Sequence, residues 1–217
     1  MKIKVDLIKR ALKRVLRGCL HKFSIDIYKY NGLSPMENYV NKHTNGKLVG
    51  VEIGVYKGIN AEKILKGMNI ETLYLIDPYL LYGKYVEGFS MYDSHKNLIG
   101  IEQKMLRKIR HYKDKYIIIK KMSADAIKDI PHNLDFVYVD GNHSYKYVLE
   151  DIELYYKKLK QGGIIGGDDF DHEYLPEVKN AVMDFVNKHK LQLNVKLQDW
   201  WVTKGQGRKK NFRLRGK

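Results

Sequence analysis

Two short segments contain most of the side chains that could perform chemistry in this chain. They are Asp140-Gly141-Asn142-His143-Ser144-Tyr145 and Gly166-Gly167-Asp168-Asp169, and each follows a run of residues typical of a buried strand. In an open parallel sheet, ligands bind just beyond the carboxyl ends of the strands. We therefore expect the carboxylates of Asp140, Asp168 and Asp169 to meet at one rim of the sheet.

Carboxylates that meet in this way need a counter-charge. Like charges repel at short range, so one acid takes up a proton unless a cation lies among them. Ligand sets made only of oxygen suit Mg²⁺, Ca²⁺ or Mn²⁺. The other interpretation is that each acid only caps the helix that follows it. The pair Asp168-Asp169, matched by the upstream Asp140, favours a functional site.

A histidine lies close to the first of these acids in the sequence. His143 follows Asp140 by three residues, at the start of a predicted helix. An imidazole there can act as a general base or form a hydrogen bond to a residue that binds a metal. It can equally be a structural histidine that bonds to the backbone at the strand end. His172, beside the aspartate pair, is a weaker candidate for the same roles.

A glycine-containing turn follows the first predicted strand, which spans 48–53. Glu52, Gly54 and Gly58 lie in the run EIGVYKG, and glycine allows a backbone to turn tightly and approach a ligand. The spacing departs from the dinucleotide fingerprint G-x-G-x-x-G. No phosphate-loop lysine followed by Ser or Thr is present, which argues against a nucleoside triphosphate.

The residues that follow the next two predicted strands are also candidates for binding a ligand. Asp77 follows the second strand, where an acid can accept hydrogen bonds from two ribose hydroxyls. Ser123 and Ala124 follow the third strand, where an adenine edge would lie, although the same residues suit a plain helix start. Together with the glycine turn, Asp77 indicates a cofactor that contains a nucleoside.

Length and composition restrict the class of protein. The 217 residues form one domain or, less favoured, two, and the 44% hydrophobic content is that of an ordinary globular chain. The single cysteine, Cys19, allows no intrachain disulfide and fits a reducing compartment. No apolar run approaches the ~20 residues that span a bilayer. Charges interrupt the first apolar positions, so we expect no signal peptide and a cytoplasmic location.

The net charge of +15 is concentrated at the two ends of the chain. Residues 1–24 hold eight Lys or Arg and one acid, residues 204–217 hold seven and no acid, and the remainder carries only +1. Apolar residues recur every three or four positions over 5–20, which predicts a basic amphipathic helix. This helix could lie on an anionic membrane surface, or pack against the body or a second subunit. The simplest interpretation is that both ends are solvated tails.

Between the ends, predicted strands and helices alternate. We expect a short helix from Pro35, capped by Ser34, to about His43. Thereafter the predicted strands cover 48–53, 72–76, 116–120, 134–139, 163–166, 191–197 and 200–203. The predicted helices cover 60–66, 94–112, 124–130, 144–160 (ending at Gly162-Gly163) and 176–189. This order implies an α/β fold with a doubly wound, Rossmann-like sheet of seven strands, the last antiparallel, and helices on both faces.

One connection is longer than the others. Residues 78–93 join the second strand to its helix and are rich in Tyr, Leu and Gly, which favours a lid over the acidic rim or, alternatively, a packing insert. We divide the chain into an N-terminal helical extension (1–46), a catalytic domain (47–204) and a basic C-terminal tail (205–217).

The order of these motifs resembles a known family. E-x-G-x-x-x-G, the strand-end Asp77, Ser-Ala-Asp, VDGNHSY and GGIIGGDDF are similar to class I S-adenosylmethionine-dependent methyltransferases. More narrowly, they resemble the small metal-dependent O-methyltransferases related to macrocin O-methyltransferase, which modify sugars and antibiotics. The resemblance covers about residues 47–204.

The resemblance implies a role for each motif. Glu52, Gly54 and Gly58 would line the methionine and ribose side of the cofactor, with Asp140 beside it. Asp77 would hold the ribose hydroxyls, and Ser123 and Ala124 would border the adenine. Asp140, Asp168 and Asp169 would ligate Mg²⁺ or Mn²⁺. Asp140 or His143 would take the proton of the acceptor hydroxyl. Asp169 stands where catechol-type relatives commonly have Asn, which suggests the macrocin-type branch.

The leading hypothesis is a Mg²⁺-dependent O-methyltransferase that acts on a sugar, a glycan or a related small molecule. It could contact an anionic membrane or form a homo-oligomer through its N-terminal helix. One alternative is an RNA methyltransferase whose basic ends hold phosphates, although no Asn-Pro-Pro-Tyr type motif follows the fourth strand. Another is a non-catalytic binding protein with a cofactor fold, against which the complete acid trio argues.

Overall fold

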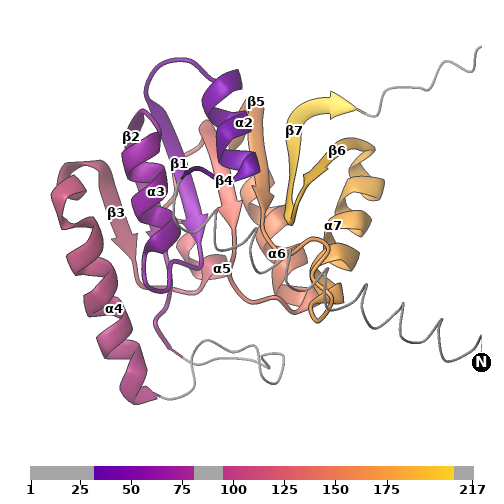
Figure 1. Ribbon diagram of the computed structural model, residues 1–217. Helices are drawn as coiled ribbons and strands as arrows, with labels where there is room; N and C mark the ends of the chain where they lie inside the picture. Colours follow the sequence, from indigo (N-terminus) through magenta and orange to yellow (C-terminus); the bar gives the residue numbers. More distant parts are fainter. Residues whose placement is uncertain (1–31, 81–94, 208–217) are drawn as a thin grey trace, which may run out of the picture.

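The structure is a computed structural model that describes residues 32–80 and 95–207 (Figure 1). The predicted amphipathic helix over 5–20, most of the predicted lid and the basic tail from residue 208 onward lie outside these described residues. Within the described part of the chain, no helix is both long enough and apolar enough to cross a membrane.

Seven strands form one mixed sheet (Figure 1). Their order across the sheet is β3-β2-β1-β4-β5-β7-β6, with β1 to β5 parallel and β7 antiparallel to both of its neighbours. This confirms the predicted doubly wound α/β sheet with an antiparallel last strand. The strands are β1 (Leu48–Ile53), β2 (Ile70–Ile76), β3 (Tyr116–Ile119), β4 (Leu134–Val139), β5 (Leu159–Gly167), β6 (Leu191–Lys196) and β7 (Asp199–Gly207).

Helices cover both faces of the sheet and bury two separate apolar cores. Alternate residues of a strand point to opposite faces, so Phe136 and Tyr138 of β4 enter one core while Val137 and Val139 enter the other. The first core lies under α2 (Pro35–His43), α3 (Ile59–Gly67) and α4 (His95–Ile109), which is followed by the 3-10 helix η1 (Arg110–Lys115). The second lies under α5 (Ser123–Ala126), α6 (Tyr145–Tyr156) and α7 (Pro176–His189).

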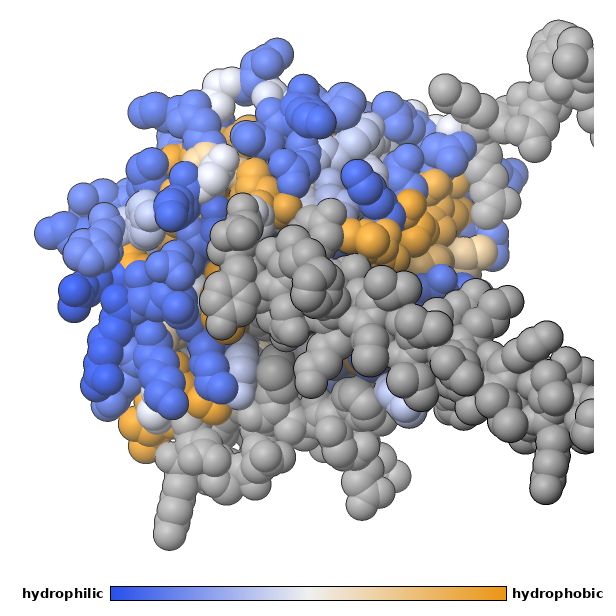
Figure 2. All heavy atoms as spheres, in the orientation of Figure 1, coloured by the Kyte–Doolittle hydropathy of each residue, from blue (hydrophilic) through white to orange (hydrophobic). Residues whose placement is uncertain are grey.

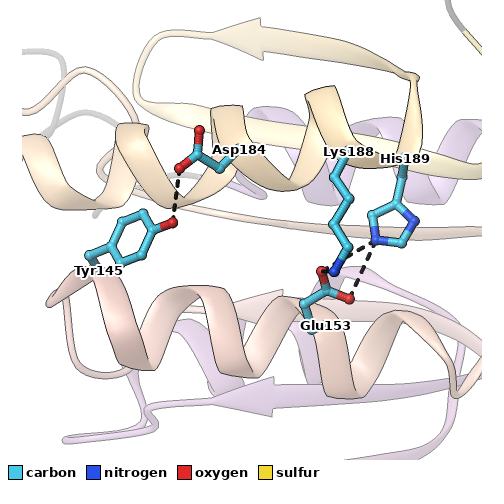
Figure 3. Close-up of polar contacts among 5 residues, drawn as sticks. All are labelled: Tyr145, Glu153, Asp184, Lys188 and His189. Atoms are coloured by element: carbon cyan, nitrogen blue, oxygen red, sulfur yellow. Dashed lines mark hydrogen bonds and ion pairs between the residues drawn. The ribbon is translucent and has the colours of Figure 1, made fainter.

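Polar contacts tie α6 to α7 and fix the start of α6 (Figure 3). The Tyr145 hydroxyl donates to Asp184 at 2.8 Å, and the Tyr145 amide donates to Glu177 at 2.6 Å. Further along, Glu153 pairs with Lys188 at 2.7 Å and with His189 at 3.3 Å. Because α6 begins directly after the segment from Asp140 to Ser144, these contacts hold that segment in place.

Several predicted boundaries are wrong. The helix expected to reach residue 160 ends at Tyr156, and β5 begins at Leu159 rather than at Gly163. Leu159 is buried and pairs with Leu134 of β4, and a register shift then carries the ladder across Gly162, whose φ is +77°. The glycines therefore form an irregularity inside a strand and not the end of a helix. The helix predicted over 124–130 also shortens to the four residues of α5.

The short helix α2 is docked firmly on the sheet. Ser34 caps it, as the sequence predicts, and Glu37 completes a capping box. The amide of Met36 donates to Asp199 at the start of β7 at 2.8 Å. Met36 and Val40 are fully buried, and the Met36 sulfur lies directly over Gly166 of β5. Although α2 falls in the N-terminal extension that we delimited, it contributes to the core of the fold.

Replacing Met36 with alanine tests how far α2 belongs to the folded unit. We expect Met36→Ala to lower the free energy of unfolding by about 2–5 kcal/mol, because it leaves a cavity between α2 and β5. Lys42→Ala, at an exposed position of the same helix, is the control and should change it by less than about 0.5 kcal/mol. Urea denaturation of both variants measures the difference, and equal stabilities would show that α2 contributes nothing to the core.

Candidate functional site

Two acids and a histidine come together at the carboxyl ends of adjacent strands. Asp140 follows β4, Asp169 follows β5, and His143 lies in the turn before α6. The Nε2 atom of His143 is 3.0 Å from Asp169 Oδ2 and 3.6 Å from Asp140 Oδ1. One ligand atom from each residue lies within 4.8 Å of the other two. Two of the three predicted metal ligands therefore meet with the predicted base.

The imidazole of His143 supplies the positive charge in this arrangement. Burial lowers its pKa, but the carboxylates of Asp140 and Asp169 outweigh burial and raise the pKa to about 10. The ring is then protonated at neutral pH and bridges the two acids as a cation. In that state it cannot accept a proton, so its predicted role as a base applies only to a site in which another cation replaces it.

Asp168 precedes Asp169 in the sequence but is not one of the three residues whose ligand atoms lie within 4.8 Å of one another. Its Oδ1 accepts the amide of Asp169 at 2.8 Å. Burial raises the pKa of Asp168 well above its usual value, and the charges of Asp169 and Asp140 raise it further. Asp169 itself has a left-handed backbone, with φ of +64°, which is unusual for a residue other than glycine. Because of this turn, the side chains of Asp168 and Asp169 point in different directions.

The donor set fits a divalent cation. Carboxylate oxygens suit Mg²⁺ and Mn²⁺, and an imidazole nitrogen shifts the preference towards Mn²⁺ and the later transition metals. The protonated ring already occupies the place between the acids that a cation would take. Asp140 and Asp169 would hold such an ion, with Asp168 close enough to add a third charge. The metal remains a prediction.

A close backbone approach joins this group to the glycine turn. Gly54 follows β1, has φ of +86°, and a Cβ atom built on it would lie 2.0 Å from the carbonyl oxygen of Asp140. Only glycine allows this approach. Gly58, with φ of +68°, is the N-cap of α3, and a Cβ atom built on it would lie 2.7 Å from the Met105 side chain of α4. Because the strand order reverses between β1 and β4, this is the position where doubly wound folds bind ligands.

Asp77 follows β2 and is 3% exposed. Its Oδ2 accepts the amides of Val55 and Tyr56 at 3.0 and 2.8 Å, and its Oδ1 accepts the amide of Tyr79 at 2.8 Å. The carboxylate therefore fixes the glycine turn.

Buried polar atoms without partners surround Glu52. This residue of β1 is fully buried, neither of its carboxylate oxygens has a hydrogen-bond partner among the described residues, and burial raises its pKa well above the usual value. Glu37 of α2 and Asn60 of α3 each contribute one more such atom. Burial also raises the pKa of Glu37, to about 7. These polar atoms are available to hydrogen-bond a ligand or ordered water at this position.

Sequence reasoning missed Glu37 and Asn60 as members of this site. Glu37 lies in the first turn of α2 and accepts the amide of Ser34 at 2.7 Å through one oxygen. Asn60 lay inside a predicted helix with nothing to distinguish it. Their common signal is burial, which depends on how α2 and α3 pack and which the local sequence does not show.

Ser123 begins α5 and turns its hydroxyl away from solvent. The hydroxyl donates to Asp151 of α6, and the Ser123 carbonyl accepts the Tyr155 hydroxyl at 2.8 Å. The Ser123 side chain is thus engaged inside the protein, and only the backbone of Ser123 and Ala124 remains available for the predicted adenine. Asp151 was also missed: it is 3% exposed, and burial raises its pKa to about 7.

Residues 51–170 match the family described as a methyltransferase domain. This segment covers more than half of the chain. The chain belongs to this methyltransferase family. "Uncharacterized protein R132" of Acanthamoeba polyphaga mimivirus is 29% identical over 157 residues, which cover 70% of this chain and 65% of the relative. The chain therefore spans less than two thirds of that relative's length.

Solved structures share the fold of this methyltransferase-family chain. The O-methyltransferase NovP matches with a TM-score of 0.56 and 18% identity, over 79% of each chain. CalS11, a TDP-rhamnose 3'-O-methyltransferase of calicheamicin biosynthesis, matches with a TM-score of 0.55 and 11% identity, over 78% of this chain and 77% of that one. An rRNA methylase from Streptococcus thermophilus has the same fold. The fold is thus that of class I methyltransferases, and it does not by itself select the acceptor.

The buried Asp151 predicts a pH dependence of stability. Its pKa is higher in the folded chain than the usual 3.8, so the folded state binds a proton that the unfolded state has released. The stabilisation is complete below about pH 4 and is lost as the pH rises through about 7. Asp151→Asn removes this dependence. The free energy of unfolding of the variant, relative to that of wild type, should therefore rise by up to about 4 kcal/mol between pH 4 and pH 8.

Denaturant unfolding of wild type and Asp151→Asn across this pH range measures the gain. Asp125→Asn, at an exposed acid of the neighbouring helix α5, is the control and should keep a constant difference from wild type. A constant difference for Asp151→Asn as well would show that the carboxyl is ionised in the folded chain throughout.

Proposed function

We propose that this protein is an S-adenosylmethionine-dependent O-methyltransferase that uses a divalent metal and acts on a hydroxyl of a sugar, a glycan or a related small molecule. The group formed by Asp140, His143 and Asp169 carries this proposal, because it lies at the strand ends directly beside the glycine turn. Membership of the methyltransferase family supports the cofactor.

Methyl transfer from a sulfonium is an in-line displacement in which the donor carries the intrinsic reactivity. The protein must therefore position the acceptor oxygen and receive its proton. A bound Mg²⁺ or Mn²⁺ would favour the ionised form of the hydroxyl. The side chain of Asp140 is 34% exposed, so it is accessible to an acceptor, and its carboxylate can receive the proton. A bound cation would favour the ionised form of Asp168, which together with Asp169 would then hold the ion.

The cofactor side is supported by the groups around β1 and β2. Gly54 leaves space against the Asp140 backbone, and Asp77 holds the turn that follows Gly54. Glu52 and Asn60 offer an acceptor and a donor for the charged amino and carboxylate groups of the methionine end. Among the described residues, the atoms concerned have no hydrogen-bond partner.

The choice of a sugar hydroxyl rests on chemistry and on similarity. Neighbouring hydroxyls of a sugar can chelate one cation through two oxygens, which the acidic group would allow. CalS11 and NovP, which share the fold, are O-methyltransferases, and CalS11 acts on a TDP-linked sugar. We extend that acceptor class to this chain as a proposal, together with a cytoplasmic location.

Replacing Asp77 tests the cofactor site. We expect calorimetry to show binding of S-adenosylhomocysteine to the wild type. Asp77→Ala should weaken it by about 1–3 kcal/mol, because an acceptor for the ribose hydroxyls and an anchor of the glycine turn are both lost. Glu71→Ala, at an exposed acid of the same strand, is the control and should bind as wild type does. The cofactor assignment fails if the wild type does not bind, or if Asp77→Ala binds equally well.

Removing the metal tests the acidic group. Methyl transfer to a vicinal diol acceptor should stop with a chelator and return with Mg²⁺ or Mn²⁺. Asp169→Asn should raise the metal concentration needed for half-maximal rate by at least about tenfold. Asp171→Asn, two residues away and 63% exposed at its side chain, should leave that concentration unchanged. Full activity of the wild type in chelator would show that the acids do not hold a metal.

A further inference from the structure

An open groove lies between the start of α3 and the C-terminal half of α4. It has a volume of about 460 Å³ and is lined by Lys57, Ile59, Lys104, Arg107 and Lys108. Four of these five side chains are cations, and Ile59 is 43% exposed. Figure 2 shows a mostly hydrophilic surface on this flank of the molecule, where α4 lies in Figure 1. We call this feature the α3–α4 groove.

The positive charge of the α3–α4 groove is only partly neutralised. Lys108 pairs with Glu62 at 3.3 Å. No acid within the described part of the chain forms an ion pair with Lys104 or Arg107. The groove also belongs to a wider basic segment, because residues 104–121 hold eight Lys or Arg and one acid, Asp114. Residues 25–203 are nearly neutral in total, but this segment is basic and acids elsewhere in that range offset its charge.

The groove is separate from the acidic group but shares a loop with the cofactor side. Lys57 follows Tyr56, whose amide donates to Asp77 at 2.8 Å, and its ammonium lies 4.6 Å from the centre of the Tyr56 ring. Asp77 therefore holds the loop that presents Lys57 to the groove. The negative charges around Asp140 and the cations of the groove attract opposite kinds of ligand, so one acceptor group does not explain both.

The chemistry of the lining indicates the class of ligand. Arginine binds phosphate oxygens through two parallel hydrogen bonds, and lysine adds point charge. Ile59 provides an exposed aliphatic side chain at the groove, and the described residues that line it include no aromatic ring for base stacking. We propose that the α3–α4 groove binds the phosphate group of a phosphate ester, through Lys57, Lys104, Arg107 and Lys108, with Ile59 against its organic part.

Inorganic pyrophosphate is the probe for this site, tested by calorimetry on the full chain in 0.1 M salt. The test variant is Lys104→Ala/Arg107→Ala. The matched control, Lys42→Ala/Lys128→Ala, removes the same charge at exposed positions on α2 and after α5. We expect the dissociation constant for pyrophosphate to rise at least tenfold in the test variant and less than twofold in the control. Binding of S-adenosylhomocysteine should be unchanged in both, which keeps this result independent of the proposed function.

Vesicles distinguish the two sources of the phosphate group. If vesicles of phosphatidylglycerol and phosphatidylcholine bind the control but not the test variant, the groove binds a lipid headgroup. If the two variants bind vesicles equally and differ only in their binding of pyrophosphate, the groove binds a soluble ester. Equal pyrophosphate and vesicle binding by wild type and test variant would overturn the proposal, because binding would then come from the basic ends. A loss confined to an oligoribonucleotide would also overturn it, in favour of a nucleic-acid surface.

Discussion

The contact between Gly54 and the backbone of Asp140 is the constraint on which the site depends. A Cβ atom at Gly54 would lie 2.0 Å from the Asp140 carbonyl oxygen, so no other residue allows the β1 and β4 ends to approach this closely. The amide of Asp140 in turn donates to the Ile53 carbonyl at 2.8 Å. These contacts place the glycine turn and the acidic group side by side, and they do so where the strand order reverses. Donor and acceptor sites must meet within a few ångströms for methyl transfer.

Buried negative charge is the second common feature of the site. Burial raises the pKa of Glu52, Glu37, Asp168 and Asp199, the last to about 6. Such groups are costly in an empty site, since each is either desolvated as an anion or held neutral away from its normal pKa. A cationic cofactor and a divalent metal would both lower this cost. The stability of the empty fold and its affinity for cations are therefore opposed.

Local sequence signals predicted the fold more fully than they predicted the site. The helix Pro176–His189 and the strands β1 and β4 have the predicted bounds, because Pro and buried apolar runs act over short distances. The start of β5 was wrong because Gly162-Gly163 suits a helix end as well as a strand irregularity. Strand-end acids were predictable from topology. Glu37, Asn60 and the α3–α4 groove were not, because their residues meet only after helices pack on the sheet.

The family segment of 51–170 does not contain the whole site. Asp199 at the start of β7 accepts the amide of Met36 in α2, so chain segments on both sides of that segment meet over the acid-rich face. Burial and the charge of Asp140 both raise the pKa of Asp199, and Asp199 in turn raises that of Asp168. The two flanking segments thus change the charge of the predicted metal side. The charge at this rim therefore depends on residues that lie outside the matched segment 51–170.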